Sequence, residues 1–141
     1  MSKQTACLYT DGASRGNPGK AGAGIVLSDP QNNILIQSKK FLGNCTNNEA
    51  EYRALILGLQ EALNLKYREL EIFLDSELVV RQMEGLYKIK NANLARFAAE
   101  TKKLLTHFDR YSFKHIPRHL NAAADRLANE AINEYNHHMP E

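Results

Sequence analysis

Four acidic residues stand where their carboxylates could do chemistry together. Asp11 and Asp75 each end a short apolar run, and Glu51 and Asp125 each fall near the start of a segment with helical periodicity. Taken singly, each has an ordinary explanation as a turn, cap or solvated helix residue. Their interest therefore depends on whether the fold brings them to one place.

Converging carboxylates predict a particular chemistry. Like charges a few ångströms apart repel and raise one another's pKa, and a hard divalent cation relieves the repulsion. Oxygen ligands without histidine or thiolate suit Mg²⁺, with Mn²⁺ as a substitute. Two such ions roughly 4 Å apart form the usual clamp for phosphodiester hydrolysis. The acids thus indicate a metal-dependent nuclease site.

The surrounding patterns predict the elements that would carry these acids. Alternation and apolar runs predict strands at residues 5–10, 23–29, 34–42, 69–75 and 110–117. Helical spacing, caps and stop signals predict helices at 48–64, 76–85, 93–108 and 121–135, the last capped by Asn121. Residues 12–19 read as a Gly/Pro loop. The order βββαβααβα predicts an α/β protein with a mixed five-stranded sheet flanked by helices.

This topology would place the acids at one edge of the sheet. The later alternation of strands and helices favours parallel pairing, and the early run of strands favours antiparallel hairpins. If the strands ending at Asp11 and Asp75 are parallel neighbours, both carboxylates emerge at the same edge, where open α/β sheets bind ligands. The helices carrying Glu51 and Asp125 would start near that edge.

Composition sets the remaining expectations. The chain has 141 residues, with 43% hydrophobic and 24% charged residues and a net charge of +2. We expect a single domain over residues 1–136 and a disordered tail over 137–141. Cys7 and Cys45 fit neither a disulfide framework nor a zinc motif. We expect a cytoplasmic monomer without a leader peptide or membrane contact.

Four segments together resemble type 1 ribonuclease H, in particular its compact archaeal and bacterial members. They are "YTDGASRGNPG", "TNNEAEYRALILGL", "DSELVV" and "IPRHLNAAADRLANEA", and they follow the family's order along the whole chain. The resemblance implies the ribonuclease H-like fold and two Mg²⁺ or Mn²⁺ ions. It also implies endonucleolytic hydrolysis of the RNA strand of an RNA/DNA hybrid to 3′-hydroxyl and 5′-phosphate products.

The resemblance assigns roles residue by residue. The family's four acids fall on Asp11, Glu51, Asp75 and Asp125. The family pattern T-N-N-x-x-E selects Glu51 rather than Glu49. The residues that it implies in substrate binding are Gly12, Ser14, Arg15, Asn17, Thr46, Asn47, Asn48 and Ser76.

Two adjacent residues compete for an auxiliary catalytic role. Many family members carry a histidine before the final helix, and compact members often carry an arginine in a shorter loop. Here Arg118 and His119 are neighbours. The local pattern favours Arg118, which would bind a phosphate, whereas His119 could move a proton. Both could also be solvated loop residues.

One departure from the family concerns how the hybrid is held. Many bacterial relatives insert a basic, Trp-rich helix where this chain has only "EGLYKIKNAN", with Lys88 and Lys90 as its cations. We therefore expect weaker, salt-dependent binding. The alternatives are another nuclease of the same fold, a non-catalytic hybrid- or RNA-binding domain, and a structural domain with incidental acids.

Overall fold

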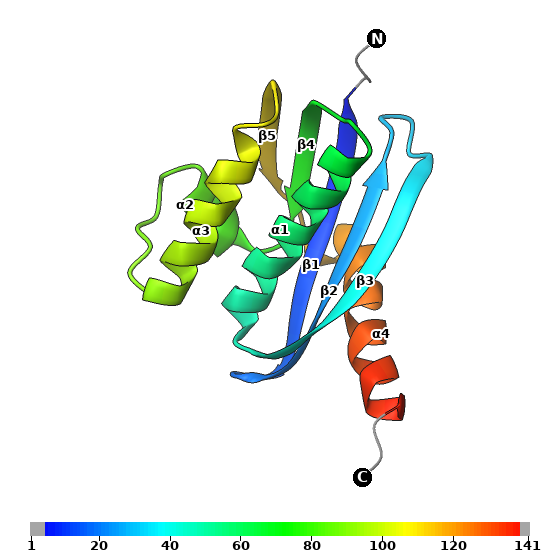
Figure 1. Ribbon diagram of the computed structural model, residues 1–141, viewed down its shortest axis with the longest axis vertical. Coiled ribbons are helices and arrows are strands. Elements are labelled where there is room, and N and C mark those ends of the chain that lie inside the picture. The colour runs from blue at the N-terminus through cyan, green and yellow to red at the C-terminus, as the bar shows by residue number, and fades with distance from the viewer. Residues whose placement is uncertain (1–4, 139–141) are drawn as a thin grey trace.

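A five-stranded sheet in the order β3-β2-β1-β4-β5 forms the centre of the computed structural model, which describes residues 5–138 (Figure 1). The strands are β1 (Ala6–Gly16), β2 (Gly19–Ser28), β3 (Ile34–Cys45), β4 (Glu69–Leu74) and β5 (Arg110–His115). β1, β2 and β3 pair in antiparallel fashion, whereas β4 is parallel to both β1 and β5. The predicted mixed sheet is confirmed.

Helices cover the two faces of the sheet. α1 (Asn47–Asn64), α2 (Glu77–Met83) and α3 (Ala92–Leu105) lie on one side, and α4 (Ala122–His138) packs over β1, β2 and β3 on the other (Figure 1). The predicted order of elements is confirmed, with one addition: a 3₁₀ turn, Arg118–Asn121, precedes α4. No helix within residues 5–138 is long and apolar enough to cross a bilayer.

The main core lies between the sheet and α1, α2 and α3. β4 alternates strictly, because Leu70, Ile72 and Leu74 are buried and the residues between them are half-buried. α1 buries a continuous apolar stripe against these strands, and removing such side chains from water is the dominant stabilising contribution. The members of this core from β1, β2 and α1 include Leu8, Ile25, Leu27, Tyr52, Leu55 and Leu59.

The predicted glycine loop is wrong, because most of it is strand. β1 runs to Gly16 and β2 starts at Gly19, so only Asn17 and Pro18 connect them. Gly16 and Gly19 serve the tight hairpin, where an added Cβ would meet the hairpin's own backbone, whereas Gly12 lies directly under a helix. A Cβ at Gly12 would overlap the backbone of Ala50 in α1. Such close approach is a reason for glycine in a strand.

The C-terminal end of the chain differs from the expectation by two residues. α4 continues through His138, so residues 137 and 138, which we expected in a tail, are helical. The rest of the expected tail, residues 139–141, lies outside the described residues.

Candidate active site

Asp11 and Asp75 come from neighbouring parallel strands. The register of β1 against β4 ends with the pair Tyr9 and Phe73, two residues before each acid. Asp11 continues β1 and is 5% exposed, and Asp75 follows the end of β4 and is half-buried. Parallel pairing therefore delivers both carboxylates to one edge, as the sequence predicted.

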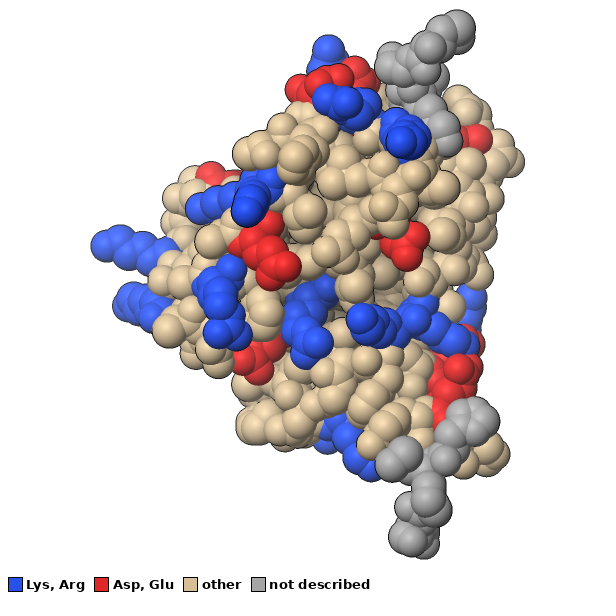
Figure 2. All heavy atoms as spheres, viewed as in Figure 1, with Lys and Arg blue, Asp and Glu red and all other residues tan. Residues whose placement is uncertain are grey.

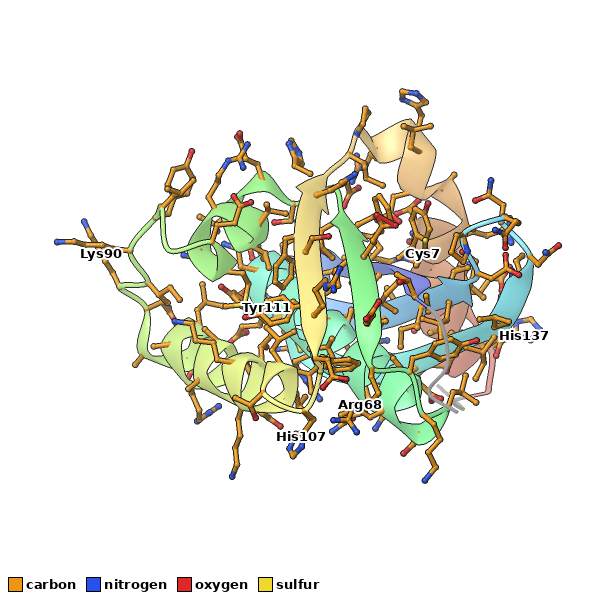
Figure 3. All side chains as sticks on the ribbon, turned by 90° about the horizontal axis from the view of Figure 1, so that it is seen from above. Cys7, Arg68, Lys90, His107, Tyr111 and His137 are labelled. Atoms are coloured by element: carbon orange, nitrogen blue, oxygen red, sulfur yellow. The ribbon has the colours of Figure 1, made fainter. Side chains whose placement is uncertain are left out.

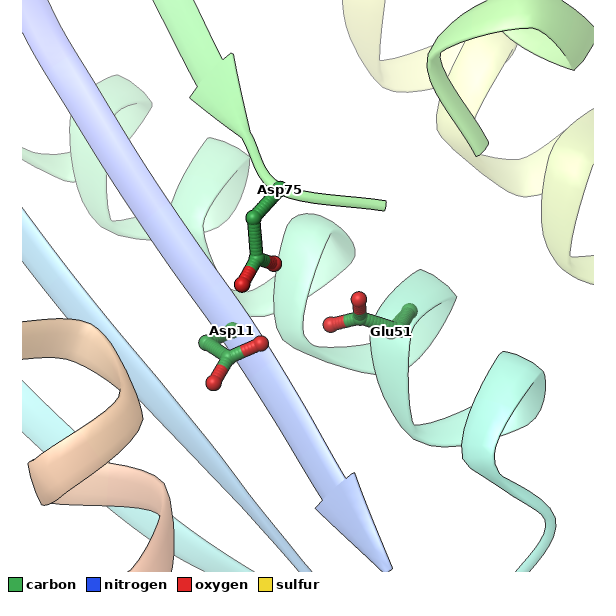
Figure 4. Close-up of side chains that lie close together, drawn as sticks. All are labelled: Asp11, Glu51 and Asp75. Carbon is green, nitrogen blue, oxygen red and sulfur yellow. The ribbon is translucent and has the colours of Figure 1, made fainter. Parts of the chain in front are cut away.

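Glu51 reaches this edge because the first turn of α1 lies against Gly12. The backbone N–H of Gly12 donates a hydrogen bond of 2.5 Å to Oε1 of Glu51. Carboxylate oxygens of Asp11, Glu51 and Asp75 all lie within 4.8 Å of one another. Figure 4 shows the three side chains pointing toward one another from β1, α1 and the end of β4.

Asp125 approaches from the opposite face of the sheet. It lies in the first turn of α4, next to Ala124 and one turn before the residues that follow Ala128. A Cβ at Gly24 would overlap the carbonyl oxygen of Ala124, and one at Gly22 would overlap that of Ala128. The bare backbone of β2 thus lets α4 come close enough for Asp125 to hydrogen-bond with Asp11.

The electrostatics of this group are those of crowded, buried acids. Burial, aided by Glu51, a hydrogen bond with Asp125 and the charge of Asp75, raises the pKa of Asp11 to about 10. Burial also raises the pKa of Glu51 to about 7, although the Gly12 N–H, the Asp11 hydrogen bond and the Arg118 charge oppose it. At neutral pH the metal-free cluster therefore retains protons that a cation would displace.

These residues fit a hard divalent cation. The cluster offers three carboxylates and no histidine or thiolate, and it is too crowded for all three acids to ionise without a counter-charge. Oxygen-only donor sets of this kind suit Mg²⁺ or Mn²⁺ rather than softer metals. Asp11, Glu51 and Asp75 thus form a potential acidic metal-binding site.

The acids line a cleft of about 510 Å³ that also contains most of the predicted binding residues. Its lining is Asp11, Gly12, Ala13, Ser14, Asn47, Asn48, Glu51, Asp75, Ser76, Arg118, Asp125 and Asn129. Of the predicted site residues, Arg15, Asn17, Thr46 and His119 are not part of this lining.

Several predicted binding residues also hold the cleft together. Thr46 caps α1 in a capping box with Glu49: Oγ1 of Thr46 accepts from the Glu49 N–H at 3.2 Å, and the Thr46 N–H donates to Oε1 of Glu49 at 2.8 Å. Oδ1 of Asn47 accepts from the Ser14 N–H, and the Asn47 N–H donates to Oδ1 of Asn17. The β1–β2 hairpin is thereby fastened to the start of α1.

Other predicted binding residues also have structural partners. Oγ of Ser76 accepts from the Val79 N–H at 3.3 Å and caps α2. The Gly12 N–H is already used by Glu51, so it is not free to donate to a ligand.

Arg118 and His119 are separated by the geometry of the 3₁₀ turn. Both side chains are exposed, but only Arg118 lines the cleft, where its charge lowers the pKa of Glu51. Sequence spacing could not distinguish them, because the 3₁₀ turn that orients them was not predicted.

Two asparagines near the acids differ from the sequence prediction: Asn121 was predicted as a helix cap, and Asn129 was not among the predicted site residues. Asn121 is 1% exposed, and its Nδ2 donates to the carbonyl oxygen of Thr10 at 2.9 Å, while its Oδ1 has no partner. The predicted cap is therefore wrong, since a cap needs that oxygen to accept. Asn129 lines the cleft and was missed, although its position four residues after Asp125 could have indicated a contact.

The segment between α2 and α3 contains no additional helix. Leu86 and Tyr87 are 68% and 46% exposed, and Lys88 and Lys90 are also exposed. Figure 3 shows Lys90 at the periphery, on the side of the molecule away from α4. This segment is therefore the short connection that the sequence predicted in place of an inserted basic helix.

Cations are also spread over the face that carries α1 and α3. Figure 2 shows Lys and Arg side chains in a band across this face. A groove there between β3, α1 and α3 is lined in part by Lys40 and Arg53. Such a band favours a polyanionic partner despite the small net charge.

Comparison with known proteins places the whole fold in one family. The model of the family described as "Reverse transcriptase-like" matches residues 9–131. The chain is 42% identical to a ribonuclease HI of Halobacterium salinarum over 126 residues, covering 89% of this chain and 63% of that protein. It is 44% identical to the bifunctional protein Rv2228c of Mycobacterium tuberculosis, covering 89% of this chain but only 35% of that protein.

Solved structures agree with these relatives. The crystal structure of RNase H1 from Halobacterium salinarum superposes with a TM-score of 0.91 at 40% identity, covering 93% of this chain and 99% of that one. LC11-RNase H1, crystallised with an RNA/DNA hybrid, gives a TM-score of 0.89 at 42% identity, covering 92% and 98%. The chain therefore belongs to the reverse transcriptase-like family and, within it, to the type 1 ribonucleases H.

Proposed function

We propose that the protein is a metal-dependent endoribonuclease that hydrolyses the RNA strand of RNA/DNA hybrids. The observation that carries this proposal is the convergence of Asp11, Glu51 and Asp75, with Asp125 beside them, in a cleft at the start of α1. The RNA/DNA hybrid bound to LC11-RNase H1 supports the choice of substrate. The products would carry 3′-hydroxyl and 5′-phosphate ends.

The four acids would hold two Mg²⁺ ions, with Mn²⁺ as a possible substitute. Bound there, such ions supply an activated water and neutralise charge on the leaving oxygen. The protein's own part is to hold the carboxylates in place. Gly12 donates to Glu51, and the contacts of α1 and α4 with strand glycines set the distance between acids on opposite faces of the sheet.

The hybrid would lie across the cleft between the hairpin and the helix starts. Ser14, Arg15 and Asn17 sit on the hairpin, where they would contact the RNA and its 2′-hydroxyls, which distinguish RNA from DNA. Thr46, Asn47 and Asn48 lie at the start of α1, where backbone N–H groups and the helix dipole favour phosphate. Gly12 and Ser76, which also line the cleft, complete the proposed binding set, Gly12 through the room that its missing side chain leaves and not through its N–H.

End-labelled substrates test this function directly. RNA/DNA hybrid, double-stranded RNA and double-stranded DNA are incubated with the protein in Mg²⁺ and, in parallel, in excess EDTA. We expect cutting of the RNA strand of the hybrid alone, and only with the metal. Equal cutting of double-stranded DNA, or full activity in EDTA, would exclude the proposal. Hybrid retention without any cutting would instead identify a binding domain.

Arg118 is proposed as the auxiliary residue and His119 as a bystander. Because Arg118 lines the cleft near Glu51, Arg118→Ala should remove a contact to the scissile phosphate or the departing product. We expect turnover to fall by about 10- to 100-fold, as for loss of a residue that assists without holding a metal. His119→Ala should change it less than about 3-fold.

Turnover of both variants is measured at saturating hybrid from pH 6 to 9, with thermal melting as the control for folding. A larger loss in His119→Ala, together with a flattened pH profile, would reverse the assignment.

We further propose that the residues up to the end of α4 form a single domain that acts as a cytoplasmic monomer. Cys7 and Cys45 are buried and unpaired, which supports a reducing setting. The exposed large apolar side chains are dispersed over several segments, which supports a monomer; they are Ile34, Leu35, Leu86, Tyr87, Tyr111 and Leu120. Light scattering on the purified protein measures the mass in solution.

A further inference from the structure

Asn129 contacts the fourth acid from one turn further along α4. Its Nδ2 donates to Oδ1 of Asp125 at 3.3 Å and to the backbone carbonyl oxygen of Asp125 at 3.0 Å. The amide nitrogen has two hydrogens, so these two contacts use its whole donor capacity. Asp125 thus has a hydrogen-bonding neighbour one turn along its own helix.

The other end of the same amide is held by the β1–β2 hairpin. Nη2 of Arg15 donates to Oδ1 of Asn129 at 3.3 Å and lies 3.4 Å from the Asn129 backbone carbonyl oxygen. Arg15 is 114 residues away in sequence. Asn129 therefore bridges a side chain on the hairpin and an acid in the cleft.

The chemistry of the two neighbours determines which way the amide points. With the nitrogen toward Asp125 and the oxygen toward Arg15, every contact pairs a donor with an acceptor. Rotated by half a turn, the amide would set oxygen against carboxylate and nitrogen against guanidinium. Hydrogen-bonding networks assign amide orientation in this way, so Arg15 keeps the donors of Asn129 aimed at Asp125.

We infer that Asn129 is a positioning residue that holds the carboxylate of Asp125 in place for metal binding, with Arg15 fixing the orientation of its amide. The inference rests on the proposed function for its activity readout. The contact with Asp11 alone leaves this carboxylate able to rotate, and Asn129 is a second partner that limits its rotation. Partners that orient a ligating carboxylate typically contribute 10- to 100-fold to metal affinity or activity.

The test compares two asparagines on the same helix. Asn129→Leu removes the bridge while keeping a side chain of similar size. Asn136→Leu is the matched control, because Asn136 also bonds the hairpin, through Nζ of Lys20 at 3.1 Å, but contacts none of the four acids. Mn²⁺ binding to each protein without nucleic acid is measured by calorimetry, and kcat and KM for the hybrid are measured across Mg²⁺ and Mn²⁺ concentrations.

For Asn129→Leu we expect weaker Mn²⁺ binding and about a 10-fold lower kcat at a fixed low metal concentration. Raised Mn²⁺ should restore most of the kcat, and KM for the hybrid should stay within about 2-fold. Asn129→Gln, which keeps the amide, should lose less than Asn129→Leu. Arg15→Ala should shift the metal dependence in the same direction by a smaller factor.

Two results would overturn the inference. One is unchanged Mn²⁺ affinity and metal dependence in Asn129→Leu, and the other is an equal shift in Asn136→Leu. Thermal melting separates unfolding from a local effect, and Asn129→Gln provides a second variant if the leucine does not fold. If the wild-type protein cuts no hybrid, the proposed function fails, whereas the Mn²⁺ calorimetry still decides the role of Asn129.

Discussion

Asp11→Asn is expected to abolish hydrolysis and, at the same time, to stabilise the metal-free protein. The residue lies at the centre of the cluster and neighbours Glu51, Asp75 and Asp125. Neutralising it removes a ligand shared by the proposed ions, so kcat should fall by about 1000-fold or more, or about 4 kcal/mol of transition-state stabilisation. In the absence of metal it also removes the cost of keeping a buried carboxyl protonated far above its ordinary pKa.

The stability effect has a defined dependence on pH. The folded-state pKa of Asp11 is about 10 against an ordinary 3.8, and that of Glu51 is about 7 against 4.5. For a carboxyl whose pKa is raised on folding, the folded state binds the extra proton, so stability is fully present below the ordinary pKa and is lost as pH rises through the raised value. The metal-free wild type should therefore lose stability steadily from about pH 4 toward pH 10.

Asp11→Asn should flatten this slope, because an amide does not titrate. Urea unfolding in EDTA at pH 5, 7 and 9 measures the free energy of unfolding for both proteins. We expect the variant to be more stable than the wild type by on the order of 2 kcal/mol at pH 9 and by less at pH 5. Added Mg²⁺ should stabilise the wild type most at high pH. If the variant retains both turnover and the wild-type dependence of the free energy of unfolding on pH, Asp11 does not belong to the site.

Glu51→Gln and Glu49→Gln are expected to differ strongly in their turnover of the hybrid. Glu51 lies within the cluster, so its replacement should lower kcat by about 100- to 1000-fold. Glu49 instead completes the capping box of α1 and accepts from Nδ2 of Asn93 at 3.1 Å. Glutamine also serves in a capping box, so Glu49→Gln should cost less than about 1 kcal/mol of stability and change kcat less than about 2-fold.

Both variants are assayed at saturating hybrid and metal, with urea unfolding alongside. The two positions are two residues apart on one helix, so a general disturbance of α1 would affect both. Loss of turnover in Glu49→Gln with normal turnover in Glu51→Gln would show that the family pattern had been aligned two residues out of register.

Periodicity and strand direction made most of the fold predictable. The apolar spacing from Ala54 to Leu63 specified α1, and parallel pairing of β1 with β4 brought Asp11 and Asp75 together as expected. What could not be predicted depends on contacts between distant segments. Gly12 looked like a loop residue, because sequence does not reveal that a helix will lie against it, and nothing around Gly22 and Gly24 showed that α4 would lie on them. The partners of Asn121 and Asn129 are Thr10 and Arg15, which lie 111 and 114 residues away in sequence, so no local pattern indicates them.

The glycines beneath α1 and α4 also limit how this protein can change over many generations. Gly12, Gly22 and Gly24 meet helix backbone rather than flexible side chains, so a larger residue there cannot be accommodated by a rotamer change. Moving either helix outward would carry Glu51 or Asp125 away from Asp11. In a randomised library selected for activity, these three positions should be as invariant as the acids, although no reacting atom touches them. Invariance alone would therefore not separate the residues that perform the reaction from those that set the spacing of the helices.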